Sequence, residues 1–218
     1  FDSEDGNGLT PLHYTARFDS YEVAVELLDY DDGMYLDNYG CSPLAVAAKY
    51  NHLEIAELFI RRGADMTPDN FQNTPLHNAI LNGHYDMMEL LCEEGGATME
   101  QNYDGCTPLH YAVAECEEVD LFAMGIHDYE YDGPNPWEYK NCAPIGVIEY
   151  LIEKFPNSLE TKADHYDGST ALILAVLHRE KEICQLLVDE GAQLSTRTDR
   201  DPSEEFLERV YQDIVSSD

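Results

Sequence analysis

The chain has 218 residues, and its 44 acidic residues against 12 basic ones give a net charge of −32 with histidine neutral. Direct partners such as nucleic acid or an anionic membrane are disfavoured, because phosphate groups are bound by clustered Lys and Arg. Repulsion among so many like charges destabilises a compact state, so we expect the charge to complement a cationic partner.

One short phrase recurs along the chain at nearly constant spacing. Its first copy reads Gly8-Leu9-Thr10-Pro11-Leu12-His13. The Thr or Ser of the five copies stands at positions 10, 42, 74, 107 and 170, so the copies are 32, 32, 33 and 63 residues apart. Self-similarity at such a period predicts a stack of like units, each touching only its neighbours, rather than one globule.

Each copy opens the same pair of predicted helices. The Thr or Ser is a helix N-cap, and Pro follows at the first helical position, where a missing N–H costs nothing, except in the fifth copy, which has Ala171 there. Short first helices are predicted, for example over residues 12–18 and 44–50. A second helix follows, with apolar pairs at i, i+1, i+4 and i+5 such as Ile55-Ala56 with Phe59-Ile60, which form one buried face. Glycines such as Gly63 end three of these second helices.

The chain resembles ankyrin repeats over about residues 5–199 in three features. These are Thr-Pro-Leu-His before a first helix, a Val/Ile–Leu-Leu second helix, and Gly-Ala-Asp before a hairpin. The resemblance implies an all-α repeat solenoid with β-hairpin fingers, in a single domain over residues 1–218. It implies a concave face lined by fingers and first helices, and a protein-binding module without catalysis. The repeats are expected at about 5–38, 39–70, 71–102, 103–165 and 166–199.

Three departures from the pattern carry further expectations. Ala45 and Ile173 stand where the other copies have His, so these two units lose a local hydrogen-bonding group. The fourth repeat carries an insertion over about 116–141, which we expect to leave the stack at the end opposite the fingers. Pro202 and the apolar positions after it predict a helix over about 202–215 that caps the stack.

Aromatic residues recur near the predicted fingertips and at the ends of the first helices. By the resemblance, both are ligand-facing positions. Rings bind Lys or Arg with about 0.5–2 kcal/mol each, and adjacent carboxylates add charge-assisted hydrogen bonds. In the alternative interpretation, the finger rings pack on the next finger. The candidates are Tyr39, Phe71, Tyr103 with Asp104, and Tyr166 with Asp167 in the fingers, and Phe18, Tyr50 and Glu115 at the helix ends.

Trp137, in the insertion, is the only tryptophan and completes the candidate partner-binding set. An exposed Trp among Tyr residues is typical of binding hot spots. Folding of the insertion back over helix surface is the alternative.

The sequence predicts no catalytic residues, no metal and no cofactor. His13, His77 and His110 occupy one repeat slot, so we expect them to bond to the capping Thr or to finger backbone rather than to zinc. The chain has no Gly-rich phosphate loop, no Gly-x-Ser-x-Gly and no His-Glu-x-x-His. We therefore expect that the chain is not an enzyme.

The six cysteines include no Cys-x-x-Cys pair, and the chain has no Asn-x-Ser/Thr acceptor. Free thiols are typical of reducing compartments, so we expect an intracellular location, cytoplasmic or nuclear. Cys116 and Cys142 bracket the insertion, and a disulfide between them is an alternative to packed thiols. No apolar run approaches the roughly 18 residues of a membrane span. Because the chain begins at Phe1 rather than Met, we expect it to be part of a longer protein.

The leading hypothesis is a monomeric, non-catalytic adaptor that binds a basic, extended segment of a partner, such as a histone-like tail or a Lys/Arg-rich signal. A second hypothesis is an acidic mimic of nucleic acid that inhibits a DNA- or RNA-binding protein. A third attributes the charge to salt adaptation. Mimicry requires carboxylates in a stripe, whereas the adaptor requires them beside aromatic rings.

Overall fold

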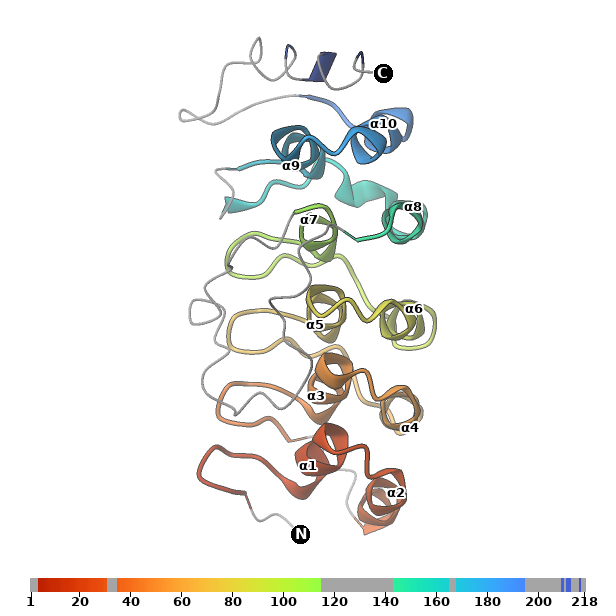
Figure 1. The fold of residues 1–218 in the computed structure, drawn as a ribbon. Helices are drawn as coiled ribbons and strands as arrows, with labels where there is room; N and C mark the ends of the chain where they lie inside the picture. The colour runs from red at the N-terminus through yellow and green to blue at the C-terminus, as the bar shows by residue number, and fades with distance from the viewer. Residues whose placement is uncertain are drawn as a thin grey trace. The chain divides into compact units, whose positions relative to one another are not determined.

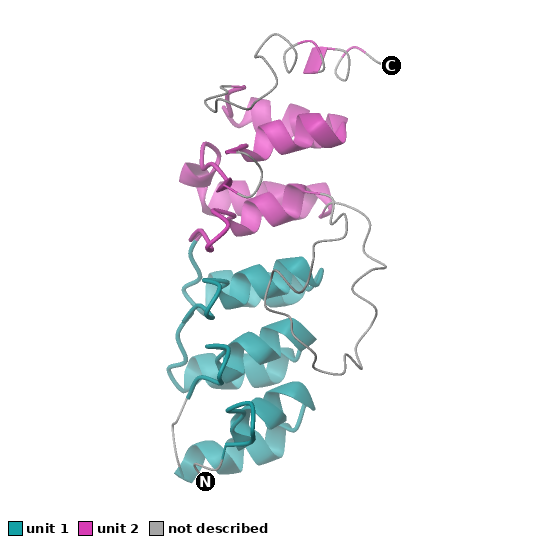
Figure 2. Ribbon diagram, turned by 90° about the vertical axis from the view of Figure 1, so that its left-hand side faces the viewer, with its two compact units in different colours: residues 1–98, 118–139 teal, residues 99–117, 140–218 magenta. Residues whose placement is uncertain are grey.

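A computed structural model describes residues 4–30, 35–114, 143–164 and 168–194, together with four positions near the C-terminus. The chain divides into two compact units (Figure 2). The described residues of the first unit are 4–30 and 35–98. Those of the second unit are 99–114, 143–164, 168–194 and the four positions near the C-terminus. In the described ranges the regular structure is helical, and the one β-bridge outside helices joins Ala163 and Ser169. None of these helices is long and apolar enough to cross a bilayer.

The first unit is built from three consecutive helix pairs. α1 packs on α3 and α3 on α5, while α2 packs on α4 and α4 on α6, so first and second helices form separate layers (Figure 1). Fully buried side chains such as Leu44, Ile55 and Phe59 fill the space between the layers. The pairs are α1 (Pro11–Arg17) with α2 (Tyr21–Tyr30), α3 (Pro43–Tyr50) with α4 (Leu53–Arg61), and α5 (Pro75–Leu81) with α6 (Tyr85–Glu93).

The second unit contains α7 (Pro108–Val113), α8 (Ile145–Lys154), a short 3-10 turn (Pro156–Ser158), α9 (Ala171–His178) and α10 (Lys181–Asp189). α7 packs on α8 and α9, and α10 packs on both α9 and α8. The first six residues of α9 are all buried, because this helix is enclosed on several sides. The insertion predicted over 116–141 lies outside the described residues. Of the predicted capping helix, only Arg209, Tyr211 and Gln212 are described, and they are helical, as is Ser216 beyond it.

The histidine of the recurring phrase closes the start of the first helix. In His13, Nδ1 accepts a hydrogen bond from the backbone N–H of Thr10 at 3.1 Å, so Nε2 carries the proton and donates to the carbonyl of Cys41 at 3.0 Å. In the second unit, His110 makes the same bond to Thr107 and donates to the carbonyl of Thr161 at 3.1 Å. The prediction that these rings bond to the capping Thr and to finger backbone is confirmed.

A second histidine slot ties the second and third repeats to the repeat before each. His52 Nδ1 donates to the carbonyl of Ala16 at 2.6 Å, and His84 Nε2 donates to the carbonyl of Lys49 at 3.0 Å. Where Ala45 replaces the phrase histidine, the Ser42 hydroxyl still accepts from the Ala45 N–H, as the Thr107 hydroxyl does from the His110 N–H, so the cap survives without the ring. Neighbouring repeats are therefore joined by polar bonds as well as by apolar packing.

The fingers of the first unit are tight turns organised by one carboxylate each. An Asp Oδ1 accepts two backbone N–H bonds, from Tyr39 and Cys41 to Asp37 at 2.9 and 2.8 Å, and likewise to Asp5 and Asp69. In the second unit, Asn102 occupies this position and accepts the same pair of bonds. The predicted β-hairpins are short turns here. The side-chain oxygen accepts hydrogen bonds from backbone N–H groups that would otherwise donate to a partner strand.

Candidate functional site

Tyr39 and Phe71 lie half-buried in successive fingers of the first unit, where backbone bonds hold them in register. The Asn70 N–H donates to the carbonyl of Tyr39 at 2.9 Å. In the same way, the Asn38 N–H donates to the carbonyl of Asn7 in the preceding finger. The side-chain amides of Asn38 and Asn70 add bonds at 3.3 and 3.1 Å to the finger before each. The two rings are thus carried on a connected edge, one in each repeat.

The carboxylates nearest to these rings are structural. Asp37 and Asp69 are each only 8% exposed, and burial raises the pKa of both despite the N–H bonds that they accept. Their oxygens are directed at the turn backbone. They therefore contribute negative electrostatic potential, but no direct contact, to a ligand at the fingers. Any carboxylate that contacts a partner at these fingers must come from elsewhere on the surface.

The ends of α1 and α3 carry a cluster in which rings and cations of this chain meet. The Arg17 guanidinium carbon lies 5.5 Å from the centre of the Phe18 ring and 6.0 Å from that of Tyr50. The Lys49 ammonium lies 5.9 Å from the Tyr50 ring, and desolvation lowers the pKa of this lysine. At this point the surface presents positive charge, although the chain is strongly acidic. The signal lay in the sequence, since Arg17 and Lys49 are 32 residues apart and immediately precede the two rings.

In the second unit, Tyr103 is 71% exposed, and Asp104 beside it is half-buried. The Asp104 N–H donates to Asn102 Oδ1 at 3.0 Å, which fixes the turn that presents both residues. The structure therefore brings Phe18 and Tyr50 to one guanidinium, places Tyr39 and Phe71 in adjacent bonded fingers, and presents Tyr103 beside its chain neighbour Asp104. The other candidates lie outside the described residues, namely Glu115, Trp137, Tyr166 and Asp167.

Metal and thiol chemistry find no support in the described part of the chain. No group of three or more His, Cys, Asp or Glu side chains could hold a metal ion there. Cys41, Cys106 and Cys184 are free thiols, and burial raises the pKa of each to about 12, so the reactive thiolate is scarce. Cys116 and Cys142, considered as a disulfide pair, lie outside the described residues.

Comparison with known proteins agrees with the repeat geometry. Residues 1–70 and 59–126 match a family model described as ankyrin repeats in three copies, and residues 167–199 match an ankyrin repeat. Human diacylglycerol kinase iota is 42% identical over 48 residues, which are 22% of this chain and 4% of the kinase. The mouse protein of the same name is also 42% identical over 48 residues, 5% of its length. Human transient receptor potential cation channel subfamily A member 1 is 32% identical over 100 residues, 43% of this chain and 9% of the channel.

The matched segments are thus a small part of these relatives. Ankyrin repeats are generally a non-catalytic fold and suggest a protein–protein interaction module. The fold class is an all-α repeat solenoid, as predicted. The chain belongs to the ankyrin-repeat family.

Proposed function

We propose that this chain is a monomeric adaptor that binds a basic, extended segment of a partner protein along its fingers. The net charge of −32 would attract such a segment over long range, with an association rate raised by roughly 10–1000-fold and strongly reduced by salt. Individual ion pairs at an exposed surface contribute only about 0.2–1 kcal/mol. Discrimination among basic segments therefore has to come from the aromatic rings.

The finger rings are the best candidates for contacts to Lys and Arg of the partner. Among the finger rings that the structure describes, Tyr103 is the most exposed, and Asp104 follows it directly. Tyr39 and Phe71 keep part of their surface exposed and lie in adjacent fingers that are bonded together. The connected fingers support the proposal, because they would meet successive residues of an extended chain at regular intervals.

The helix-end rings receive a different role in this proposal. Because Phe18 and Tyr50 already lie beside Arg17 and Lys49, a further cation there would be repelled. We expect these two rings to contact apolar or acidic side chains of the partner. Glu115, Trp137, Tyr166 and Asp167 remain predicted contacts.

Changing Tyr39, Phe71 and Tyr103 together to Ala is expected to weaken binding of a 20-residue Lys/Arg-rich peptide by at least about tenfold in roughly 0.5 M salt. Loss of three ring contacts at about 0.5–2 kcal/mol each accounts for this effect, since about 1.4 kcal/mol is tenfold in affinity. Fluorescence anisotropy of the labelled peptide measures the affinity, and high salt removes most of the long-range attraction.

The matched control changes Tyr30 and Tyr35, which are exposed but lie outside the fingertips, to Ala. Equal affinity of the triple variant and the parent chain would refute the finger site. Salt adaptation makes a separate prediction, namely that the chain unfolds in dilute buffer and regains its structure in molar salt.

A further inference from the structure

Two of the few cations of this acidic chain meet at one tyrosine ring, between the first and the second repeat. The Arg17 guanidinium carbon lies 6.0 Å, and the Lys49 ammonium 5.9 Å, from the centre of the Tyr50 ring. Only 12 of the 218 residues are basic, yet two of them, from different repeats, share this ring. Together with Phe18 these residues form what we call the helix-end cluster, and described residues build both of its sides.

The repeat architecture by itself does not require cations at these positions. In the third repeat the equivalent residues, 32 positions further on, are Leu81 and Asn82. The first helix of that repeat, α5, has no basic residue in its last turn, yet it packs on α3 as α1 does. A basic residue near a helix C-terminus interacts favourably with the helix dipole, but two that share one ring also repel each other. Helix stability therefore does not account for the pair.

Burial adds to the cost of placing the two cations together. Desolvation lowers the pKa of Lys49 and the charge of Arg17 lowers it further, while the nearby Asp37 carboxylate acts in the opposite direction. Asp37 is buried, and its Oδ1 accepts from two N–H groups of its own finger. In the described part of the chain, no carboxylate lies within ion-pair distance of Lys49. An anionic ligand at this point would offset both the desolvation and the repulsion.

Hydrogen bonds from the following repeats fix the backbone that carries the two cations. His52 Nδ1 donates to the carbonyl of Ala16, the residue before the first cation, and His84 Nε2 donates to the carbonyl of Lys49 at 3.0 Å. The ring of Tyr50 stacks on that of His52, with ring centres 6.2 Å apart. A site whose groups are already held in place loses less entropy when a ligand binds.

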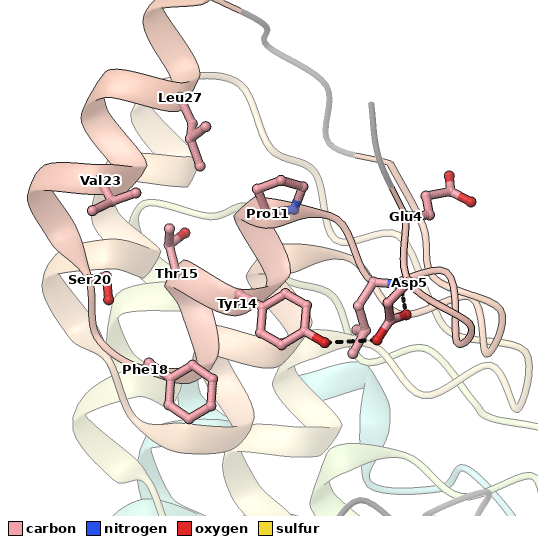
Figure 3. Close-up of a pocket in the computed structure, with 10 residues that line it drawn as sticks. Glu4, Asp5, Pro11, Tyr14, Thr15, Phe18, Ser20, Val23 and Leu27 are labelled. Atoms are coloured by element: carbon pink, nitrogen blue, oxygen red, sulfur yellow. Dashed lines mark hydrogen bonds between the residues drawn. The ribbon is translucent and has the colours of Figure 1, made fainter. Parts of the chain in front are cut away.

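The other side of the cluster is tied to the first finger. The Arg17 guanidinium carbon lies 5.5 Å from the centre of the Phe18 ring, which stacks on the ring of Tyr14 at 6.2 Å. The Tyr14 hydroxyl donates to Asp5 Oδ2 at 2.8 Å (Figure 3). Rings thus flank the cations, and the attraction between a cation and an anion is stronger beside such apolar surface than in open water.

We propose that Arg17 and Lys49 bind the carboxylate of an acidic residue in the partner segment, while Phe18 and Tyr50 contact the apolar part of that side chain. Guanidinium and ammonium groups form charge-assisted hydrogen bonds with a carboxylate. This inference rests on the proposed binding of a basic segment at the fingers. It adds to that segment one acidic residue, and so predicts a partner of mixed charge.

The acidic residue would set the register of the bound segment. Basic residues that repeat along an extended chain can meet the finger rings in several equivalent positions. A Lys or Arg placed against the helix-end cluster would face two like charges, whereas an Asp or Glu there would meet two opposite ones. Only registers that bring the acidic residue to Arg17 and Lys49 would therefore be favoured.

Two 20-residue peptides test the proposal by fluorescence anisotropy with the full chain, in about 0.15 M salt to screen long-range attraction. Both alternate Lys or Arg with Ala and differ only at the central position, which is Glu in one and Gln in the other. The Glu peptide is expected to bind at least about threefold more tightly. Net charge alone predicts the opposite order, because the chain carries −32 and the Gln peptide is the more positive. Equal affinities, or tighter binding of the Gln peptide, would overturn the proposal.

A double variant locates the site. Arg17→Met with Lys49→Met removes both charges but keeps apolar side chains of similar length, and it is expected to abolish the preference for the Glu peptide. The matched control, Arg61→Met with Lys154→Met on α4 and α8, changes the net charge equally and is expected to keep the preference. Circular dichroism verifies that both double variants fold. A preference for Glu that survives without Arg17 and Lys49 would place the acidic residue elsewhere and reject the site.

One outcome would identify a different occupant. If the parent chain binds both peptides equally and the Arg17 and Lys49 double variant unfolds at a lower temperature than its control, a carboxylate of the chain itself occupies the cations. That result also overturns the proposal.

Failure of the finger proposal is distinguishable from failure of this one. If neither peptide binds the parent chain, the proposed function fails and this inference fails with it; if both bind equally, only the inference fails. The Tyr39, Phe71 and Tyr103 triple variant is expected to bind both peptides more weakly and to keep the ratio of their affinities, because the helix-end cluster is intact in it.

Discussion

Gly40→Ala is expected to lower the free energy of unfolding of the first unit by about 2–5 kcal/mol. Gly40 has a φ of +77°, and a left-handed conformation costs a residue with a Cβ roughly 1–2 kcal/mol. In addition, a Cβ at this position would lie 2.6 Å from Asn70 Oδ1 and 2.8 Å from the Asn70 backbone nitrogen. Relief of that overlap has to move the next finger, which adds about 1–3 kcal/mol.

Two other glycines separate these causes. Gly63 has a φ of +89° but no heavy atom near its Cβ position, so Gly63→Ala is expected to show the conformational cost alone, about 1–2 kcal/mol. Gly146 lies in α8 with open space around it, and Gly146→Ala is expected to stabilise that helix by up to about 1 kcal/mol. Thermal unfolding measures the three effects, and hydrogen exchange over residues 36–60 reports the loss around Gly40. Equal losses for Gly40→Ala and Gly63→Ala would show that the finger contact is unimportant.

Acidification from about pH 7.5 to 4.5 is expected to cost the folded second unit about 2.5 kcal/mol through His110 alone, since one pKa unit equals 1.36 kcal/mol. Burial lowers the pKa of His110 to about 4, from an ordinary value of 6.5. The unfolded chain therefore binds the proton more readily. The stabilisation is complete above about pH 6.5 and is lost as the pH falls toward 4.

Other groups titrate in the same range, so a variant is needed to isolate this contribution. Asp37 and Asp69 have raised pKa values, which favour folding at low pH, and protonation of surface carboxylates reduces repulsion. The free energy of unfolding of the parent chain is compared with that of His110→Gln at each pH, and the difference between the two should shrink on acidification. An NMR titration of the His110 ring provides the direct measurement. An apparent pKa near 6.5 would contradict the buried, neutral imidazole.

Much of the helical architecture could be predicted from local patterns. Thr10 and Thr74 cap first helices that begin at the following Pro, as predicted, because capping depends on residues within one turn. The histidine slot was also assigned correctly, since its fixed offset from the capping Thr places the ring against that residue. The second bond of this slot joins His110 to the carbonyl of Thr161, 51 residues later. To predict it, one needed only to expect that another finger follows the helix.

The candidate surface was less predictable. Asp37 and Asp69 read as ordinary acidic residues in a sequence with 44 of them, yet they organise the finger turns. The contact between Arg17 and Tyr50 joins two repeats, so only the stacking of α1 on α3 shows that the cation of one repeat meets the ring of the next. The net charge predicts an acidic surface, but it does not show where the few basic residues lie.

The repeat period, the caps and the apolar faces of the helices follow from the amino-acid sequence by itself, because they depend on neighbours within a few residues. The tertiary structure decided which rings meet cations and how neighbouring fingers are bonded to one another. Those properties depend on contacts between residues about 32 positions apart, and local patterns contain no information about the distances across such contacts.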